Sequence, residues 1–494
     1  MKIPEFVKQA ISALETANFE AFIVGGSLRD LLLDLEPKDW DLTTNARPEE
    51  VLQVFPTAHY ENVFGTVILP IKDEANNVLE ITTYRSEGAY SDRRHPDQIN
   101  FEDSLDKDLE RRDFTINALA LGRFKVVPES LKKFIEPIEI DKQEYYLVDL
   151  FGGREDLKKK IIRAVGEPSD RFKEDALRMM RAVRFTSQLD FVLEPKTERA
   201  IAKLAGIIKF IAPERIKDEL IKILSSNKPA NGIFKMHELN LLRYIIPELE
   251  DGVGVRQYYH HIYPVFEHNL RSLDKCPSLE WPVRLAALLH DVGKPKVFKM
   301  IDGQGTFYNH EYVGAKITER IMKRLKFSTA DSLRVVNLVR NHMFYYSVGE
   351  VTAASVRRLI AKTGRDNLRD LIDIRIADRL GSGDLKPKPY KLRHLEYMFE
   401  KVQNDPVSVK MLKINGDDLI RELKLEPSPK MGAMLEVLLS EVLEDPKFNE
   451  YEYLLKQART LNSLDLEALR AQAKAIIAKR QAEDDQALKR DFKV

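Results

Sequence analysis

The stretch AFIVGGSLRDLLLDLEPKDWDLTT, residues 21–44, decides how the first part of this chain folds. An apolar run, Phe22 to Val24, ends at the pair Gly25-Gly26, and an amphipathic segment follows from Ser27. This order predicts a strand, a tight glycine turn and a helix with Ser27 as its N-cap. Two adjacent glycines let backbone N–H groups approach a phosphate, and a helix N-terminus favours an anion. Most glycine turns are only turns, so this pattern alone does not establish a binding site.

Two aspartates, Asp39 and Asp41, flank Trp40 in a segment that the sequence predicts to be extended. Side chains at i and i+2 share one face of a strand, so the two carboxylates repel each other unless a cation lies between them. A divalent metal that carries a nucleoside triphosphate meets this need. The alternative is a surface strand with two solvated aspartates, which the spacing by itself favours.

Length and composition indicate a globular protein that works in water. The chain has 494 residues, which predicts about three domains, and it is 44% hydrophobic and 32% charged. No apolar run reaches the ~20 residues that a membrane span needs, and the first residues lack a secretory pattern. The single cysteine, Cys276, excludes an internal disulfide and suits a reducing compartment. We therefore expect a cytoplasmic location and no membrane partner.

The charge is unevenly distributed along the chain. The formal net charge is zero, yet residues 151–230 carry 18 Lys and Arg against 12 Asp and Glu. A basic middle between acidic flanks allows a localised site for a polyanion. Ordinary fluctuation along a charged chain explains the same numbers equally well.

Two further segments carry candidate functional residues. DLERRDFTINALAL, residues 108–121, predicts a helix with Asp113 and Asn117 four residues apart after a double arginine. Arginine suits phosphate because its planar fork binds two oxygens at once. FKEDALRMMRAVRF, residues 172–185, predicts one helix with Glu174, Arg178, Arg181 and Phe185 on one face. The alternative for this helix is a wet face with ion pairs at i,i+3 and i,i+4.

Taken together, GGSLRD, DWD, RRDFTINA and EDALR resemble the signatures of the nucleotidyltransferase superfamily. The resemblance is to class II, the branch that holds bacterial tRNA nucleotidyltransferases (CCA-adding enzymes) and bacterial poly(A) polymerases. Leu28 departs from the usual GG-x-V-R-D pattern but keeps its apolar character. The resemblance implies a catalytic site with Mg²⁺ held by Asp39 and Asp41, and a third acidic residue, Glu80, beside them. It implies that the incoming nucleotide is bound by Gly25, Gly26, Arg29, Arg112, Asp113, Asn117, Asp175, Arg178, Arg181 and Arg184.

In this family the segment that begins at Glu174 recognises the base of the incoming nucleotide, and the chemistry of its side chains is consistent with this role. Cytosine and adenine both present an amino donor and a ring-nitrogen acceptor on the Watson–Crick edge. Asp175 would accept from the amino group while Arg178 donates to the ring nitrogen. Uracil and guanine present a carbonyl and an N–H there, so the same pair would reject them.

Three intervening segments complete the first half of the chain. Residues 84–101 are polar and aperiodic, which predicts a loop; a disordered connection is the alternative. In CCA-adding enzymes a flexible loop lies here and takes part in the switch from adding C to adding A, and its full length favours complete CCA addition. We expect residues 122–148 to be an irregular surface insertion. Residues 212–226 predict a basic amphipathic helix that resembles the family's neck segment.

The chain changes character near residue 258. Six of the ten histidines lie between His260 and His342. The motifs around them resemble an HD domain, the helical fold of metal-dependent phosphohydrolases. This resemblance implies metal ligands at His268, His290, Asp291 and Asp378, with His310 and His342 available to a second ion. Imidazole with carboxylate suits a transition metal better than Mg²⁺.

The sequence therefore predicts an α+β head with a small mixed sheet, followed by all-α parts. The expected domains are a nucleotidyltransferase head (1–150), a helical neck and body (151–255), an HD domain (256–385) and a helical tail (386–494). The last segment, residues 466–490, predicts an exposed charged helix. The expected function is addition of C, C and A to tRNA from CTP and ATP, by a monomer or homodimer. Poly(A) polymerase, an HD phosphohydrolase with an RNA-binding first half, and a non-catalytic RNA-binding module are the alternatives.

Overall fold

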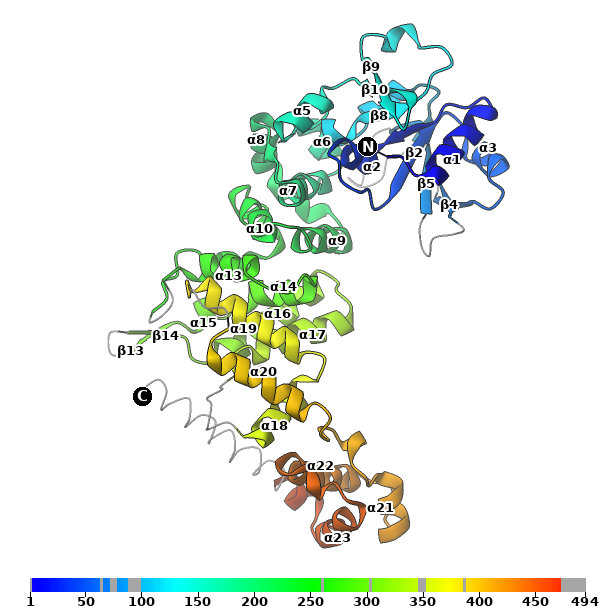
Figure 1. Ribbon diagram of the computed structural model, residues 1–494. Coiled ribbons are helices and arrows are strands. Elements are labelled where there is room, and N and C mark those ends of the chain that lie inside the picture. Colours follow the sequence, from blue (N-terminus) through cyan, green and yellow to red (C-terminus); the bar gives the residue numbers. More distant parts are fainter. Residues whose placement is uncertain are drawn as a thin grey trace. The chain divides into compact units, whose positions relative to one another are not determined.

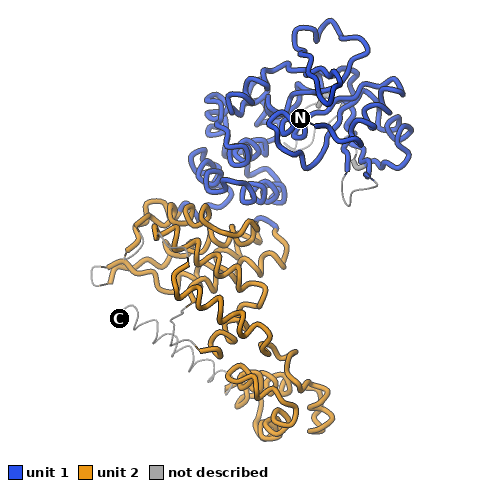
Figure 2. Tube along the Cα trace, in the orientation of Figure 1, with its two compact units in different colours: residues 1–250, 324–326 blue, residues 251–323, 327–494 orange. Residues whose placement is uncertain are grey.

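The computed structural model describes residues 2–62, 65–71, 78–87, 99–258, 262–301, 304–344, 352–384 and 388–471. The chain divides into two compact units, residues 1–250 with 324–326 and residues 251–323 with 327–494 (Figure 2). Part of the predicted loop (88–98), His260, His261 and the last predicted helix from residue 472 onward lie outside the described residues. The domain boundaries at 150, 255 and 385 stay predictions.

The first unit contains an eight-stranded sheet with the order β3-β4-β5-β2-β1-β8-β10-β9 (Figure 1). Its strands are β1 (Phe22–Val24), β2 (Trp40–Thr44), β3 (His59–Asn62), β4 (Thr66–Pro70), β5 (Val78–Thr83), β8 (Leu119–Gly122), β9 (Ile135–Ile140) and β10 (Gln143–Asp149). Strands β2 and β5 pair in parallel, and the other neighbours pair antiparallel. The predicted α+β class with a mixed sheet is confirmed.

The central strand β1 passes directly into helix α2 (Gly25–Leu32). Because β1 lies between β2 and β8, all three of its residues are buried, which explains its uninterrupted apolar run. Ser27 lies inside the helix, so its prediction as an N-cap was wrong. Gly25 has φ +70°, and this left-handed conformation lets the backbone enter the helix two residues earlier. The Ser27 hydroxyl instead donates to the Val24 carbonyl (2.8 Å) and accepts from the Asp41 N–H (3.3 Å).

The predicted surface insertion at residues 122–148 is partly regular. Residues 123–134 contain only the 3₁₀ turn η2 (Glu129–Leu131), whereas residues 135–148 form the hairpin β9–β10. Strand β10 pairs with β8 over four residues from Leu119 to Gly122. The prediction was wrong for this hairpin, whose residues Tyr145, Leu147 and Val148 are buried. These side chains extend the sheet and its core. The ends of the predicted loop at 84–101 also pair, as the short strands β6 (Arg85–Glu87) and β7 (Ile99–Phe101).

Two predicted helices of the first unit are broken. Helix α4 (Leu105–Glu110) ends before Asp113, and Asn117 closes a single 3₁₀ turn, η1 (Thr115–Asn117). The segment at 172–185 is two helices, α6 (Pro168–Glu174) and α7 (Leu177–Leu189), separated at Asp175, whose backbone is extended. Both breaks place backbone and side-chain polar groups where a continuous helix would not, and Asp175 caps α7 by accepting from the Leu177 N–H (3.0 Å).

The other helices of the first unit bury one apolar face. Helix α1 buries Val7, Ala10, Ile11 and Leu14. Helix α9 confirms the predicted amphipathic helix at 212–226, but its predicted basic character was wrong, because three basic and three acidic residues balance there. These helices are α1 (Glu5–Thr16), α3 (Pro48–Val54), α5 (Gly153–Lys159), α8 (Pro195–Leu204), η3 (Ala205–Phe210), α9 (Pro213–Leu224), α10 (Pro229–Glu238), α11 (Leu242–Ile245) and α12 (Pro247–Glu250). Helix α7 packs against both α9 and α10, which explains why it is buried along most of its length.

The second unit is helical apart from a short hairpin, β13 (Lys299–Ile301) with β14 (Gln304–Thr306) (Figure 1). Its helices are α13 (Val265–Asp274), α14 (Trp281–Leu289), α15 (Lys294–Val297), α16 (His310–Arg324), α17 (Thr329–Asn341), α18 (Ala353–Thr363), α19 (Leu368–Gly381), α20 (Tyr390–Val402), α21 (Gly416–Leu423), α22 (Pro429–Glu444) and α23 (Tyr451–Leu461). Among the described helices, none is both long and apolar enough to cross a lipid bilayer.

Candidate active site

The parallel pairing of β2 with β5 brings two carboxylates together. Asp41 on β2 is the register partner of Glu80 on β5, so the two side chains lie on the same face of the sheet. Asp39 precedes β2 and is exposed. Burial raises the pKa of Asp41; Arg112 opposes this shift, and the nearby negative charge of Asp39 adds to it. Carboxylate oxygens are the ligands that Mg²⁺ prefers, but among the described residues Asp39, Asp41 and Glu80 do not lie close enough to one another to form a metal-binding group of the kind found in the second unit.

Gly25 leaves room for the side chains that face this strand end. A Cβ placed on Gly25 would lie 3.1 Å from Asp41 Oδ2 and 3.3 Å from Arg112 Nη1. Gly25 also has φ +70°, a conformation that side chains with a Cβ rarely adopt. Both facts require glycine here. The chain thus lets a carboxylate and a guanidinium approach the first turn of α2 from two sides.

A buried aspartate that the sequence analysis missed orients Arg112. Asp108 is fully buried and accepts hydrogen bonds from Arg111 Nη2 (2.7 Å), Arg112 Nη2 (3.0 Å) and the Thr43 hydroxyl (3.3 Å). Burial would raise the pKa of Asp108, but the two guanidinium groups outweigh it and lower that pKa. The signal was present in the sequence, because Asp108 lies three and four residues before the double arginine.

Asp113 and Asn117 connect the first turn of the site to helix α7. Asn117 donates to Asp113 Oδ1 (3.1 Å) and accepts from Arg29 Nη1 (3.0 Å), while Arg181 Nε donates to Asp113 Oδ2 (2.7 Å). Burial opposes ionisation of Asp113, but Arg181 and the Asn117 amide lower its pKa to about 2. The carboxylate therefore stays charged and holds Arg181 in place.

Three arginines surround the ring of Phe185 on α7. The guanidinium carbons of Arg184, Arg29 and Arg181 lie 4.5, 5.1 and 5.7 Å from its centroid. Arg184 also lies 3.2 Å from Glu219 Oε2, and burial followed by repulsion from Arg181 lowers the pKa of Arg184 to about 10. Each of the three guanidinium groups also pairs with a carboxylate, Arg29 with Asp30, Arg181 with Asp113 and Arg184 with Glu219, so the ring gathers donors whose charges are compensated.

The two residues expected to read the base have separate partners. Asp175 accepts from Arg215 Nη2 (2.7 Å) and Nη1 (3.3 Å), which come from α9. Arg178 pairs with the Glu174 carboxylate and donates to the Arg111 carbonyl (3.4 Å). The expectation of one continuous helix over residues 172–185 was wrong, because the helix is broken at Asp175. Arg215 was missed, since an ion pair across 40 residues leaves no local pattern in the sequence.

In the second unit, six side chains from five segments of the chain form two adjoining groups. One group contains His268, His290 and Asp378, and the other contains Asp291, His310 and His342, with all ligand atoms of each group within 4.8 Å of one another. All six residues are buried. Asp291 joins the two groups, because its Oδ2 lies 3.3 Å from His290 Nε2 and its Oδ1 lies 3.2 Å from His310 Nε2.

Three of these histidines present the same ring nitrogen to the cluster. Nδ1 of His290, His310 and His342 contacts the backbone carbonyl three residues earlier, at 2.8, 2.9 and 2.7 Å. A carbonyl accepts from Nδ1–H, so each of these rings presents Nε2 to the cluster, where it lies close to the neighbouring imidazoles and to Asp291. Burial opposes ionisation of Asp291, but His290 and Lys294 hold its pKa well below its usual range. Each of the two groups therefore has the residue types and the spacing that could hold a metal ion.

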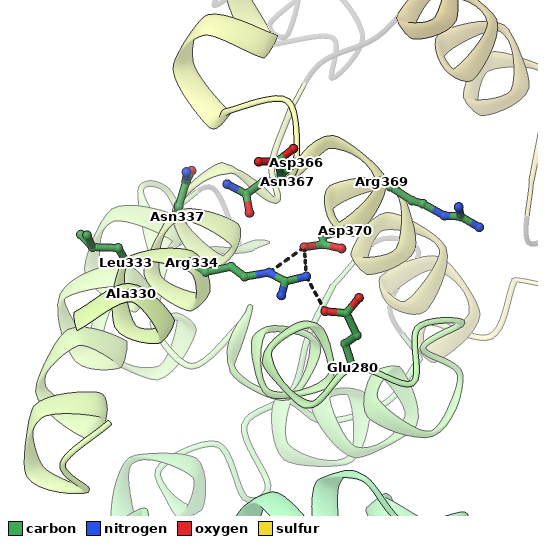
Figure 3. A pocket seen from close by; sticks show the side chains of 9 residues that line it. All are labelled: Glu280, Ala330, Leu333, Arg334, Asn337, Asp366, Asn367, Arg369 and Asp370. Carbon is green, nitrogen blue, oxygen red and sulfur yellow. Dashed lines mark hydrogen bonds and ion pairs between the residues drawn. The ribbon is translucent and has the colours of Figure 1, made fainter. Parts of the chain in front are cut away.

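A separate polar cavity of about 620 Å³ lies between helices α14, α17 and α19 (Figure 3). Arg334 crosses it and pairs with Asp370 Oδ2 (2.7 Å) and Glu280 Oε2 (2.8 Å). The described residues that line this cavity are all different from the predicted site residues. Arg334 is thus paired with two of the three carboxylates that line the cavity, and this ion-pair network joins α14, α17 and α19.

Three family models match successive parts of the chain. They are the poly A polymerase head domain at residues 21–163, the probable RNA and SrmB-binding site of polymerase A at 190–252 and the HD domain at 265–382. The CCA-adding enzyme of Ligilactobacillus salivarius is 34% identical over 467 residues, which cover 93% of this chain and 98% of that enzyme. This chain belongs to the CCA-adding enzyme family of tRNA nucleotidyltransferases.

Other members of this family differ in name or are known in three dimensions. The A-adding tRNA nucleotidyltransferase of Deinococcus radiodurans is 33% identical over 85% of this chain and 90% of its own length. The Bacillus stearothermophilus CCA-adding enzyme in complex with CTP covers 94% of this chain and 100% of its own, with a TM-score of 0.68 and 25% identity. A Thermotoga maritima CCA-adding enzyme complexed with tRNA (TM-score 0.51, 20% identity, 93% and 97% covered) shows the same fold.

Proposed function

We propose that this chain adds C, C and A to the 3′ end of tRNA from CTP and ATP and releases pyrophosphate. The observation that carries the proposal is the pairing of Asp41 with Glu80 beside Gly25 and Arg112, in a member of the CCA-adding enzyme family. Mg²⁺ bound by Asp39 and Asp41, with Glu80 beside them, would activate the tRNA 3′-hydroxyl and neutralise charge on the α-phosphate. Poly(A) polymerase is the nearest alternative, because one family model bears that description.

The other residues around this site have separate roles in binding the triphosphate. Arg112 is held by Asp108 near the first turn of α2, where it can bind the triphosphate bidentately. Gly25 and Gly26, at the N-terminus of α2, allow the phosphates to approach closely. Asn117 accepts a hydrogen bond from Arg29 and positions it on the same side of the site. Arg181 and Arg184 add hydrogen-bond donors next to Phe185. Each side chain is fixed by another element before the nucleotide arrives, which lowers the cost of ordering it.

Base choice is assigned to Asp175 and Arg178. Asp175 would accept from the amino group of cytosine or adenine, and Arg178 would donate to the ring nitrogen. Both side chains now pair with other groups, Arg215 and Glu174. A base that offers the matching donor and acceptor can share or replace these partners, whereas uracil and guanine would leave charged groups unpaired.

One relative favours a narrower activity. The Deinococcus radiodurans protein is named for adding A alone, so A addition to tRNA that already ends in CC is the second candidate. Purified protein with Mg²⁺ and labelled CTP or ATP should be tested on tRNA transcripts that lack the whole CCA end, its last two nucleotides or only the final A. Complete addition predicts product from all three. Product only from the last transcript would establish the narrower activity, and long A tails on RNA without a tRNA fold would establish a poly(A) polymerase.

The second unit supports a second chemistry. Two groups of buried ligands that share Asp291 fit two transition-metal ions, and a metal pair of this kind activates water for phosphate ester hydrolysis. We propose that this cluster holds metal and acts as a phosphohydrolase site separate from nucleotide addition. We also propose that the protein acts in the cytoplasm, where tRNA, ATP and CTP are present together. It would act there as a monomer or a homodimer.

A further inference from the structure

Arg171, on helix α6, connects three segments of the first unit through the nitrogens of its guanidinium group. Its Nε donates to the Val165 carbonyl (3.1 Å), and its Nη2 donates to the Glu110 carbonyl (2.9 Å). Its Nη1 donates to both carboxylate oxygens of Glu174, at 3.0 and 3.2 Å. The side chain is 17% exposed. A planar guanidinium fork can hold several acceptors at fixed angles, which the single ammonium group of lysine cannot do.

The contact with Glu110 fixes the end of the helix that precedes the arginine assigned to the triphosphate. Glu110 is the last residue of α4, and the carbonyls of the last helical turn have no partner inside the helix. Arg171 satisfies one of these carbonyls. Arg178 Nη2 donates to the next carbonyl, that of Arg111 (3.4 Å). Arginines from α6 and α7 therefore bind the two carbonyls directly before Arg112.

The contact with Glu174 fixes the arginine that is assigned to the base. The Glu174 carboxylate lies between two guanidinium groups, because it pairs with Arg178 as well as with Arg171. Arg178 Nη1 also donates to the backbone carbonyl of Arg171 (3.3 Å). The helix break at Asp175 separates these two arginines, so their ion pairs bridge the break.

The contact with Val165 holds a third segment of the site. Val165 donates from its N–H to the Asp113 carbonyl (3.1 Å), and the neighbouring residues Phe114 and Ala164 form an antiparallel bridge. Arg171 therefore contacts the backbone before Arg112 directly and the backbone after it through Val165.

We propose that Arg171 is a positioning residue that couples recognition of the base by Arg178 to placement of the triphosphate by Arg112. The inference rests on the proposed function, because that function assigns the base and the triphosphate to these two arginines. Arg171 keeps Glu174 and the end of α4 fixed relative to each other, so a nucleotide whose base is bound by Arg178 also meets Arg112 in its productive position. The competing view is that Arg171 only stabilises the packing of α4 and α6.

The test measures whether the two arginines act together. In the full-length chain, kcat/KM for CTP is measured for Arg178→Ala, for Arg112→Lys and for the double variant. The loss in the double variant should differ from the product of the two single losses by about tenfold, because residues that act through shared partners are not additive. In chains that also carry Arg171→Met, the loss should equal that product within about twofold. A residue that only stabilises packing would lower every rate and leave the coupling in place.

Two further variants complete the experiment. Arg171→Lys keeps the charge but lacks the planar fork, so it should remove the coupling as Arg171→Met does while it disturbs the packing less. Lys173→Met is the matched control, because Lys173 lies on the same helix and pairs with the exposed Asp170. The control should keep both the wild-type kcat/KM and the coupling.

Two results would overturn the inference. One is a coupling between Arg112 and Arg178 that persists in both Arg171 variants. The other is a pair of additive losses in the chain that keeps Arg171, because there would then be no coupling for it to carry. Failure of the proposed function is a different result, since wild-type protein would then add neither C nor A to tRNA that lacks its CCA end.

Discussion

Asp41 and Glu80 are direct register partners on the parallel strands β2 and β5. They are 39 residues apart in the sequence, and the sheet places their carboxylates on one face. This arrangement gives the candidate catalytic site an acidic group on the strand beside Asp41. A cation bound there would be held from two strands rather than from one.

We expect Asp41→Asn and Asp39→Ala to reduce the addition of both C and A by at least about 100-fold, because each removes a charged metal ligand. Glu80→Gln should reduce kcat for both nucleotides, with a smaller loss if Glu80 only supports the site. Binding of tRNA should be nearly unaffected, which filter binding can measure. Retention of a tenth of wild-type turnover in either aspartate variant would contradict the assignment.

Alanine substitutions at Gly25 and Gly152 can distinguish the effect of backbone strain from the effect of steric crowding. Both have positive φ, +70° and +76°, so alanine at either position should cost about 1–2 kcal/mol in the free energy of unfolding. In the described part of the chain, no atom lies within 4 Å of a Cβ built at Gly152, whereas a Cβ at Gly25 meets Asp41 and Arg112. Gly25→Ala should therefore lower kcat/KM by about 100-fold or more, as misplaced catalytic groups do. Gly152→Ala should leave kcat/KM close to wild type, and equal losses in the two variants would contradict the role of Gly25.

The ion pair between Asp175 and Arg215 predicts that a substitution outside the base-binding residues can also weaken base selection. Asp175→Ala should admit UTP and GTP at rates nearer to those of CTP and ATP, since one matched hydrogen bond contributes about 1–3 kcal/mol of discrimination. Arg215→Ala should relax selection in the same direction, because it releases the Asp175 carboxylate from α9. Arg178→Ala should weaken C and A addition together. All four nucleotides should be measured in competition on tRNA without its CCA end.

Lys196→Ala is the control for this series, because it removes an exposed ion pair with Glu167 in the same unit. It should leave base preference as in the wild type. Unaltered preference in Asp175→Ala and Arg215→Ala would mean that these residues only stabilise the helices α6, α7 and α9.

The histidine cluster predicts a metal content that depends on which ligand is removed. Elemental analysis after mild purification should find a transition metal in the wild type. His290→Ala should lose the ion of its own group, His342→Ala that of the other, and Asp291→Ala both, because Asp291 joins the groups. Nucleotide addition should stay within about twofold of wild type in all three, since it depends on other residues and on Mg²⁺.

His237→Ala is the matched control, because His237 pairs with Glu250 outside the cluster. Its metal content should equal that of the wild type. Wild-type protein without metal would indicate that the second unit only supports the fold, and loss of nucleotide addition in His290→Ala would contradict the separation of the two sites.

Much of the candidate site could be predicted because its residues are near neighbours in the sequence. Gly25, Gly26, Asp39 and Asp41 lie within 17 residues, and their positions follow from one strand, one turn and one further strand. The candidate ligands of the second unit lie on the helices α13, α16 and α19 or directly after α14 and α17, from residue 268 to residue 378. They were predicted from their residue types and their resemblance to a known pattern, and not from local structure.

The parts that could not be predicted depend on contacts between distant segments. Asp108 and Arg215 act through ion pairs with residues that the sequence had already marked, and only the fold shows which partner each one takes. Neither a glycine nor a proline marks the helix break at Asp175 in the sequence. The break is stabilised by an ion pair with Arg215 of another helix, which only the fold shows. Ser27 has the residue type of an N-cap, but a left-handed glycine two residues earlier starts the helix before it.

The hairpin β9–β10 has a consequence for how this protein behaves at high concentration. Strand β8 is buried on both faces, and without β10 it would present an open row of backbone donors and acceptors to other molecules. Strand β9 forms the outer edge instead, and it carries Glu136, Pro137 and Glu139, which are exposed. Proline removes a donor, and the two negative charges repel a second identical edge. A shortened chain without this hairpin should therefore form aggregates by edge-to-edge strand pairing, even though every residue of the catalytic site remains.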